Sequence, residues 1–122
     1  MITLFDLSGK NDLRFSPYCW RVKYLLNFRK IIYQTKPTCF TERLNNTFFG
    51  DAKLPTITDD GIKISNSFNI AEHIENKYVD IDQRIINPAN KSSLYFINNW
   101  SDHFLNASIL ERVAYDIISV LD

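Results

Sequence analysis

The order of strand and helix patterns in residues 1–38 constrains the fold more than any other feature of this sequence. The apolar run ITLFDL at residues 2–7 is bounded by SGKND, which predicts a buried strand followed by a loop. A helical pattern begins at Pro17, and the alternating stretch IIYQTK at residues 31–36 predicts a second strand that stops at Pro37. The beginning of the chain is therefore expected to form a strand–helix–strand unit.

Two strands and a helix are predicted to follow in residues 54–78. LPTIT and IKIS flank Asp59-Asp60-Gly61, a tight-turn signal that joins antiparallel strands. The aperiodic residues 38–53 are expected to hold a short helix inside a loop. The final helix is capped by Asn66 or Ser67. Its inward-facing residues are predicted to be Ile70, Ala71, Ile74 and Tyr78, and its water-facing residues Glu72, Glu75 and Asn76.

The helix that starts after Ser16 has the clearest beginning in the chain. Ser16 stands at the N-cap and Pro17 at the first helical position, which are the positions these residue types prefer. On this pattern alone, Ser16 is a helix cap that needs no ligand. The predicted buried face carries Cys19, Val22, Leu25 and Leu26, and the predicted exposed face carries Lys23, Asn27 and Lys30.

Residues 94–121 carry apolar side chains at helical spacing on two sides. Such a helix is expected to pack on both sides. No later helix follows to supply that packing, so the chain is expected to stop inside an all-helical domain. The polar, proline-punctuated residues 80–90 are expected to be a linker. Phe96, Trp100 and Phe104 are predicted to be core residues.

Charge and composition exclude several classes of function. Fourteen basic residues balance fourteen acidic ones, so neither nucleic acid nor an anionic membrane surface is an expected partner. The start of the chain lacks a signal peptide pattern and no apolar stretch is long enough to span a bilayer, which predicts a cytoplasmic protein. Two cysteines are too few for a disulfide framework and fit a reducing compartment. His73 and His103 lack ligands at metal-binding spacing, so no metal site is predicted.

Three segments together resemble the glutathione S-transferase family: SPYCWRVKYLLNF at 16–28, LPTITDDG at 54–61 and NSFNIAEHIENKY at 66–78. The FDL strand, the SPYxWR opening and FINNWSDHF are most similar to bacterial β-etherases and their fungal etherase-like, serine-type relatives. The resemblance implies an α/β chain with a thioredoxin-like fold, a mixed four-stranded sheet in βαβ-ββα order. Residues 1–79 would be the glutathione-binding domain, 80–90 the linker and 91–122 the truncated beginning of the helical domain.

The resemblance also implies a glutathione site, with glutathione as co-substrate and no metal. Ser16 would stabilise the glutathione thiolate, and Leu54 would pair its backbone with the cysteinyl part at a cis peptide bond to Pro55. Asn66 and Ser67 would hold the γ-glutamyl end, although Asn66 replaces the usual acid and offers the ammonium group only a neutral acceptor. Lys53 would reach the glycyl carboxylate. Each site residue also has a structural interpretation: a capping pair for Asn66 and Ser67, a strand-starting proline, and a solvated loop lysine.

Three functions remain open from the sequence. The leading hypothesis is an etherase-like glutathione transferase whose thiolate attacks an electrophilic carbon of a small substrate, with a homodimer expected if the helical domain is completed. The alternative is a catalytically weak or inactive module that binds glutathione or another protein. The third is a monothiol redox protein using Cys19, because glutaredoxins carry Cys-Pro-Tyr-Cys where this chain has Ser-Pro-Tyr-Cys. It ranks last, because the nucleophilic first cysteine is missing and a buried Cys19 is the simpler interpretation.

Overall fold

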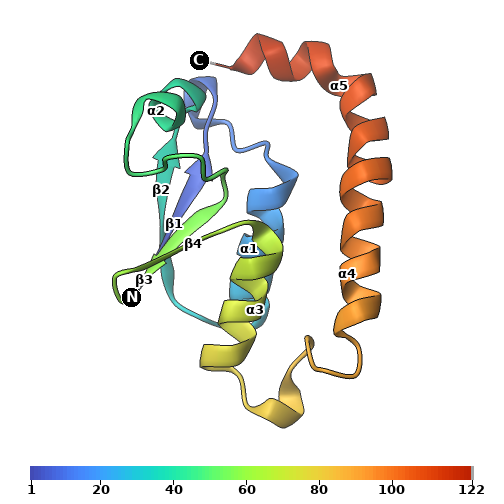
Figure 1. The fold of residues 1–122 in the computed structure, drawn as a ribbon. Coiled ribbons are helices and arrows are strands. Elements are labelled where there is room, and N and C mark those ends of the chain that lie inside the picture. The colour runs from blue at the N-terminus through green and yellow to red at the C-terminus, as the bar shows by residue number, and fades with distance from the viewer. Residues whose placement is uncertain (122) are drawn as a thin grey trace. The chain divides into compact units, whose positions relative to one another are not determined.

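The computed structural model describes residues 1–121 (Figure 1). The strands are β1 (Ile2–Leu7), β2 (Tyr33–Thr38), β3 (Thr56–Asp59) and β4 (Ile62–Ser65). The helices are α1 (Pro17–Phe28), α2 (Phe40–Asn45), α3 (Ser67–Tyr78), α4 (Lys91–Trp100) and α5 (Asn106–Val120). Short 3-10 turns occur at Lys10–Asp12 and Ile81–Gln83, and a π-helical segment, Ser101–Leu105, lies between α4 and α5.

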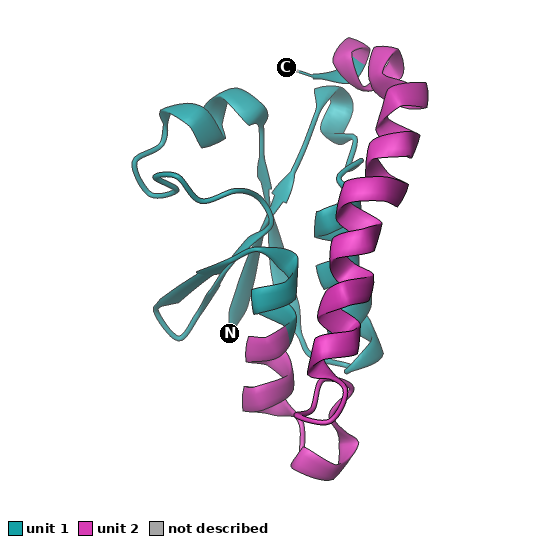
Figure 2. Cartoon of the chain, turned by 45° about the vertical axis from the view of Figure 1, so that its right-hand side comes forward, with its two compact units in different colours: residues 1–71, 120–122 teal, residues 72–119 magenta. Residues whose placement is uncertain are grey.

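The chain divides into two compact units, coloured separately in Figure 2. Of the described residues, the first comprises 1–71 together with Val120 and Leu121, and the second comprises 72–119. The boundary falls within α3, one turn after the helix begins. The sheet, α1, α2 and the first turn of α3 therefore belong to the first unit.

The first unit is built on a four-stranded sheet in the order β2-β1-β3-β4. β1 runs parallel to β2 in a register that pairs Ile2 with Tyr33, and it runs antiparallel to β3. β3 and β4 form the predicted hairpin, whose two-residue turn places Asp60 and Gly61 at φ 48° and 82°. Two successive positive φ angles give a turn whose twist suits a hairpin. This mixed sheet confirms the predicted thioredoxin-like fold.

The predicted end of β2 at Pro37 is wrong. The strand continues to Thr38, and Pro37 pairs in register with Asp6 of β1. β2 is an edge strand, where proline is tolerated because its missing N–H can lie on the solvent side. The short helix predicted in residues 38–53 is confirmed as α2.

Most of the predicted buried faces are confirmed, but two charged residues lie inside rather than outside. Lys23 is only 7% exposed and Glu75 only 1% exposed. Lys23 donates to the buried Asp6 carboxylate, and the Glu75 carboxylate accepts the backbone N–H of Ile85. A specific partner offsets the cost of burying each charge, and helical spacing does not reveal such a partner. Tyr78, predicted to face inward, is 41% exposed.

A nearly continuous helical segment runs from Lys91 to Val120, as α4, the π-helical segment and α5 follow one another directly, and its residues up to Ser119 belong to the second unit. Within this part of the described chain no helical residue is buried. The prediction that Phe96, Trp100 and Phe104 are core residues is therefore wrong for this chain, since they are 72%, 49% and 65% exposed. Among the described residues, no helix has the length and apolarity needed to cross a membrane.

Candidate functional site

A cleft of about 450 Å³ in the first unit brings most of the predicted site residues together. Its walls come from the segment before β3, from the junction between β4 and α3, and from the first turn of α1. The eight residues that line it are Tyr18, Asp51, Lys53, Leu54, Pro55, Ser65, Asn66 and Ser67. Five of the six residues predicted from the sequence thus share one cavity, and Ser16 is not among them.

Leu54 presents unpaired backbone groups to this cleft. The Leu54–Pro55 peptide bond is cis, and the carbonyl of Pro55 accepts the backbone N–H of Asn66 at 3.3 Å. The backbone N–H and carbonyl of Leu54 make no hydrogen bond within residues 1–121. Because backbone polar groups are rarely left without a partner, this segment is suited to pair with an extended peptide ligand.

The start of α3 leaves two hydrogen-bond donors on one residue. Asn66 caps the helix, because its side-chain oxygen accepts from the backbone N–H groups of Phe68 at 2.9 Å and Asn69 at 3.4 Å. Neither the backbone N–H nor the hydroxyl of Ser67 has a partner within the described part of the chain. Two unpaired donors at the positive end of a helix dipole are suited to a carboxylate.

The capping role of Asn66 changes what this residue can offer a ligand. Its φ of 77° lies in the left-handed region, which asparagine tolerates better than most residues. Since its oxygen is engaged by the helix, the amide NH₂ is the group left for a ligand. Asn66 is therefore a donor at this site, which suits a carboxylate rather than an ammonium group.

The cleft carries one charge of each sign next to Leu54. Lys53 and Asp51 are both exposed, and Arg43 of α2 holds the backbone beside them. The Arg43 guanidinium donates to the carbonyl of Ala52 from Nε at 3.1 Å and from Nη2 at 3.0 Å. A backbone held by Arg43 between two exposed charged side chains can select a ligand terminus without a deep pocket.

Ser16 lies beside the cleft rather than on its wall. It is 6% exposed, and its hydroxyl oxygen accepts the backbone N–H of Cys19 at 3.3 Å, which confirms the predicted helix cap. Tyr18, two residues later, does line the cleft, and the guanidinium of Arg21 lies 5.0 Å from the centre of its ring. Sequence reasoning missed Tyr18, Asp51 and Ser65, and its only signal for Tyr18 was the position directly after Pro17 at the helix start.

Cys19 lies in the first turn of α1, is buried, and has a thiol of low reactivity. Burial raises the pKa of its thiol to about 11, and hydrogen bonds with Ser16 and with the backbone of Leu7 oppose the rise only in part. Both cysteines are free, and within the described residues no cluster of side chains is arranged to hold a metal ion. Cys19 is thus a poor nucleophile at neutral pH.

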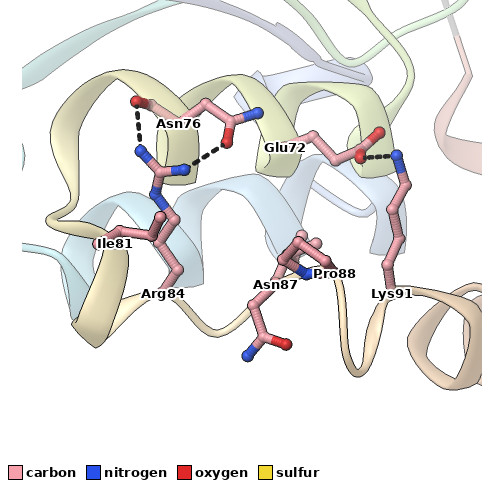
Figure 3. Close-up of a pocket in the computed structure, with 8 residues that line it drawn as sticks. Glu72, Asn76, Ile81, Arg84, Asn87, Pro88 and Lys91 are labelled. Atoms are coloured by element: carbon pink, nitrogen blue, oxygen red, sulfur yellow. Dashed lines mark hydrogen bonds and ion pairs between the residues drawn. The ribbon is translucent and has the colours of Figure 1, made fainter.

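A second cleft, of about 280 Å³, lies in the second unit (Figure 3). Arg84 donates to the side chain and the backbone carbonyl of Asn76 at 3.0 Å each, and to the carbonyl of Val79 at 3.1 Å. Lys91 forms an ion pair with Glu72. Since the charged side chains of this cleft already have partners, these contacts serve to tie the segment after α3 to that helix.

The comparison of the sequence with protein families decides the classification. Residues 12–82 match the glutathione S-transferase N-terminal domain, and this match spans more than half of the chain. The chain belongs to the glutathione S-transferase family. The match covers α1, the sheet from β2 on and all of α3, and so includes every residue that lines the first cleft.

Solved structures of fungal glutathione transferases share this fold. Two from Phanerochaete chrysosporium, GSTFuA2 and GSTFuA3, align over 99% of this chain and 55% of their own, with TM-scores of 0.84 and 0.83 and identities of 17% and 16%. A glutathione S-transferase of Ceriporiopsis subvermispora, in complex with glutathione, aligns over 87% of this chain and 48% of its own, with a TM-score of 0.70 and 24% identity. The chain thus spans about half the length of these transferases.

Proposed function

We propose that the first unit binds glutathione in the cleft around Leu54 and Ser67 and lowers the pKa of its thiol as a glutathione transferase does. The observation that carries this proposal is the set of unpaired donors and acceptors in one cavity: the backbone of Leu54 and both donors of Ser67. A peptide with a free carboxylate matches both. The solved relative in complex with glutathione supports this choice of peptide.

In this proposal each part of glutathione meets a different element. The γ-glutamyl carboxylate accepts hydrogen bonds from Ser67 and from the amide of Asn66 at the start of α3. The cysteinyl residue pairs its backbone with that of Leu54, and the glycyl carboxylate lies near Lys53. Asn66 stands where the family usually has an acid and brings no charge to the γ-glutamyl ammonium group, so the affinity for this group is expected to be low.

Ser16 is proposed to stabilise the thiolate. A free thiol near pKa 8.5 is only a few per cent ionised at pH 7, and lowering the pKa by two units takes about 3 kcal/mol. A hydrogen bond to a charged group contributes about 1.5–3 kcal/mol and a helix N-terminus about 0.3–2 kcal/mol. The Ser16 hydroxyl oxygen accepts one N–H of the helix, and its proton can rotate toward a neighbouring acceptor.

The proposed reaction is attack of this thiolate on an electrophilic carbon, with formation of a C–S bond and departure of the leaving group with its electron pair. The etherase-like residues at 16–21 support an aryl ether as one such substrate, with a phenolate as the leaving group.

A second candidate is a glutathione-binding module without transferase activity. The observations that favour it are the absence of Ser16 from the residues lining the cleft and the exposed aromatic side chains of α4. In that case glutathione binds while its thiol keeps its ordinary pKa. The two candidates therefore differ in a measurable property of the bound ligand.

The deciding experiment is calorimetric titration of glutathione into the 122-residue chain, the Ser67→Ala variant and the Ser16→Ala variant. The transferase proposal expects weaker binding in Ser67→Ala. It also expects a thiol pKa of bound glutathione that is low in the parent and rises in Ser16→Ala. Binding without a lowered thiol pKa supports the module, and no binding by the folded parent chain refutes both.

A further inference from the structure

A cluster of charges, with Asp6 and Lys23 buried and Arg14 partly buried, adjoins the segment that carries Ser16. Asp6 on β1 is 1% exposed, and its Oδ2 accepts from Nη1 of Arg14 at 2.8 Å and from Nζ of Lys23 at 2.9 Å. Its Oδ1 is also buried. One carboxylate therefore joins three elements of the first unit: β1, the loop before α1, and α1 itself.

Further contacts extend this cluster along the same loop. Nε of Arg14 donates to Oδ1 of Asp12 at 2.6 Å, and the same oxygen accepts the hydroxyl of Ser8 at 2.8 Å. Together these two hydrogen bonds lower the pKa of Asp12 below its ordinary value. Trp20 closes the loop from the helix side, since its Nε1 donates to the carbonyl of Arg14 at 2.8 Å.

The cluster holds the chain on both sides of Ser16. Arg14 lies two residues before it, and its side chain and its carbonyl are both engaged. Lys23 lies two turns into α1, with its Nζ 3.5 Å from the centre of the Trp20 ring. Residues 14–23 are thereby tied to Asp6 of β1 at both ends, with Ser16 between the two contacts.

Stability alone is a weak reason for such an arrangement. Burying ion pairs costs desolvation free energy, and apolar replacements of similar size are often neutral or stabilising. What an ion pair supplies and an apolar contact does not is direction, because each hydrogen bond fixes an angle as well as a distance. The geometry of the cluster is therefore its distinctive property.

We propose that Asp6 is a positioning residue, which through Arg14 and Lys23 fixes the Ser16 hydroxyl and the N-terminus of α1 where a glutathione thiolate would meet them. The effect on the glutathione thiolate rests on the proposed function, whereas the positioning of Ser16 by Asp6 does not depend on it. Asp6 is buried and acts through Ser16.

The direction in which one substitution changes the thiol pKa of bound glutathione separates positioning from a simple charge effect. Asp6→Asn removes a negative charge near the helix start and leaves Arg14 and Lys23 in place. If the cluster acted only through its charge, the thiol pKa of bound glutathione would fall. If it positions Ser16, the hydrogen bond to the thiolate loosens and the thiol pKa rises.

Two measurements test this proposal on the full chain. The first is NMR hydrogen exchange at the Cys19 amide, which donates to Ser16, relative to the Leu26 amide farther along α1. The second is the thiol pKa of bound glutathione, followed by thiolate absorbance. For Asp6→Asn we expect at least a tenfold loss of protection at Cys19 relative to Leu26, and a thiol pKa raised by about one unit.

Two further variants complete the test. Arg14→Lys keeps the charge but cannot bridge Asp6 and Asp12, so it should change both measurements in the same direction; it also replaces Asp6→Asn if that variant does not fold. Asp59→Asn is the matched control, because Asp59 is a fully buried carboxylate near the opposite end of β1. It should leave the exchange ratio and the thiol pKa unchanged.

Each outcome decides between the two ideas. A lowered thiol pKa in Asp6→Asn, or an unchanged exchange ratio in both Asp6→Asn and Arg14→Lys, overturns the positioning role. If the parent chain binds no glutathione, the proposed function fails, while the Cys19 amide still reports whether Asp6 positions Ser16.

Discussion

The chemical inertness of Cys19 gives a sharp test of the first unit, because the chain contains only one other thiol. Cys19 is completely buried, and burial raises its pKa from an ordinary value of about 9 to about 11. Cys39 is partly exposed. The two single variants, Cys39→Ser and Cys19→Ser, each leave one thiol to be followed.

The expected difference follows from the thiolate fraction, since the thiolate is the species that reacts with alkylating reagents. At pH 8, a thiol with pKa 11 is about 0.1% ionised, roughly a hundredfold less than the same thiol would be at its ordinary value of about 9. Burial of the sulfur slows the reaction further. We therefore expect Cys19, the thiol that remains in Cys39→Ser, to react at least a hundredfold more slowly than Cys39, the thiol that remains in Cys19→Ser.

Iodoacetamide labelling followed by intact mass measures both rates. The labelling rate of Cys39→Ser should also rise about tenfold per pH unit until the pH approaches 11. Complete labelling of both variants in denaturant is the control that each thiol is intact. Similar rates for the two folded variants at pH 8 would refute the burial of Cys19 and would revive the monothiol redox hypothesis.

Three other perturbations have defined outcomes. Because the pKa of Cys19 is raised in the folded state, its contribution to stability is complete below about pH 9 and is lost as the pH rises toward 11. Urea unfolding should therefore show that the unfolding free energy falls between pH 7 and pH 10.5 by about 2 kcal/mol less in Cys19→Ala than in the parent chain. Asn66→Ala removes a cap at a positive φ and should cost about 1–2 kcal/mol of unfolding free energy, whereas Asn66→Gly should be nearly neutral, because glycine relieves the strain. Tyr18→Phe should leave the thiol pKa of bound glutathione unchanged in a spectroscopic titration; a rise would move the role of Ser16 to Tyr18.

Local sequence signals predicted most of the fold. Three short-range features could each be predicted from two or three adjacent residues: the cap at Ser16, the hairpin turn at Asp60-Gly61 and the cap at Asn66. Their order along the chain predicted the strand–helix–strand unit and the hairpin with its following helix, and the resemblance to glutathione S-transferases added the thioredoxin-like fold. The exact end of β2 was missed, because tolerance of Pro37 depends on the strand lying at the edge of the sheet.

The features that sequence reasoning missed depend on contacts between distant residues. Lys23 looks like a water-facing residue from its helical position, and only the approach of Asp6, seventeen positions earlier, explains its burial. The role of Asn66 as a donor likewise depends on which of its side-chain atoms the helix engages. In the cleft, the resemblance indicated which residues gather there, but the backbone geometry decides which groups remain unpaired.

The number of residues in the π-helical segment Ser101–Leu105 determines how the side chains of α5 are rotated about the helix axis. One π turn holds about one residue more than an α turn, so every later side chain is rotated by roughly 100° relative to an uninterrupted α-helix. Deleting a single residue from this segment would therefore rotate all the side chains of α5 about the helix axis by roughly 100°. It would leave the composition of α5 intact but exchange the row that carries Leu110 for a neighbouring row.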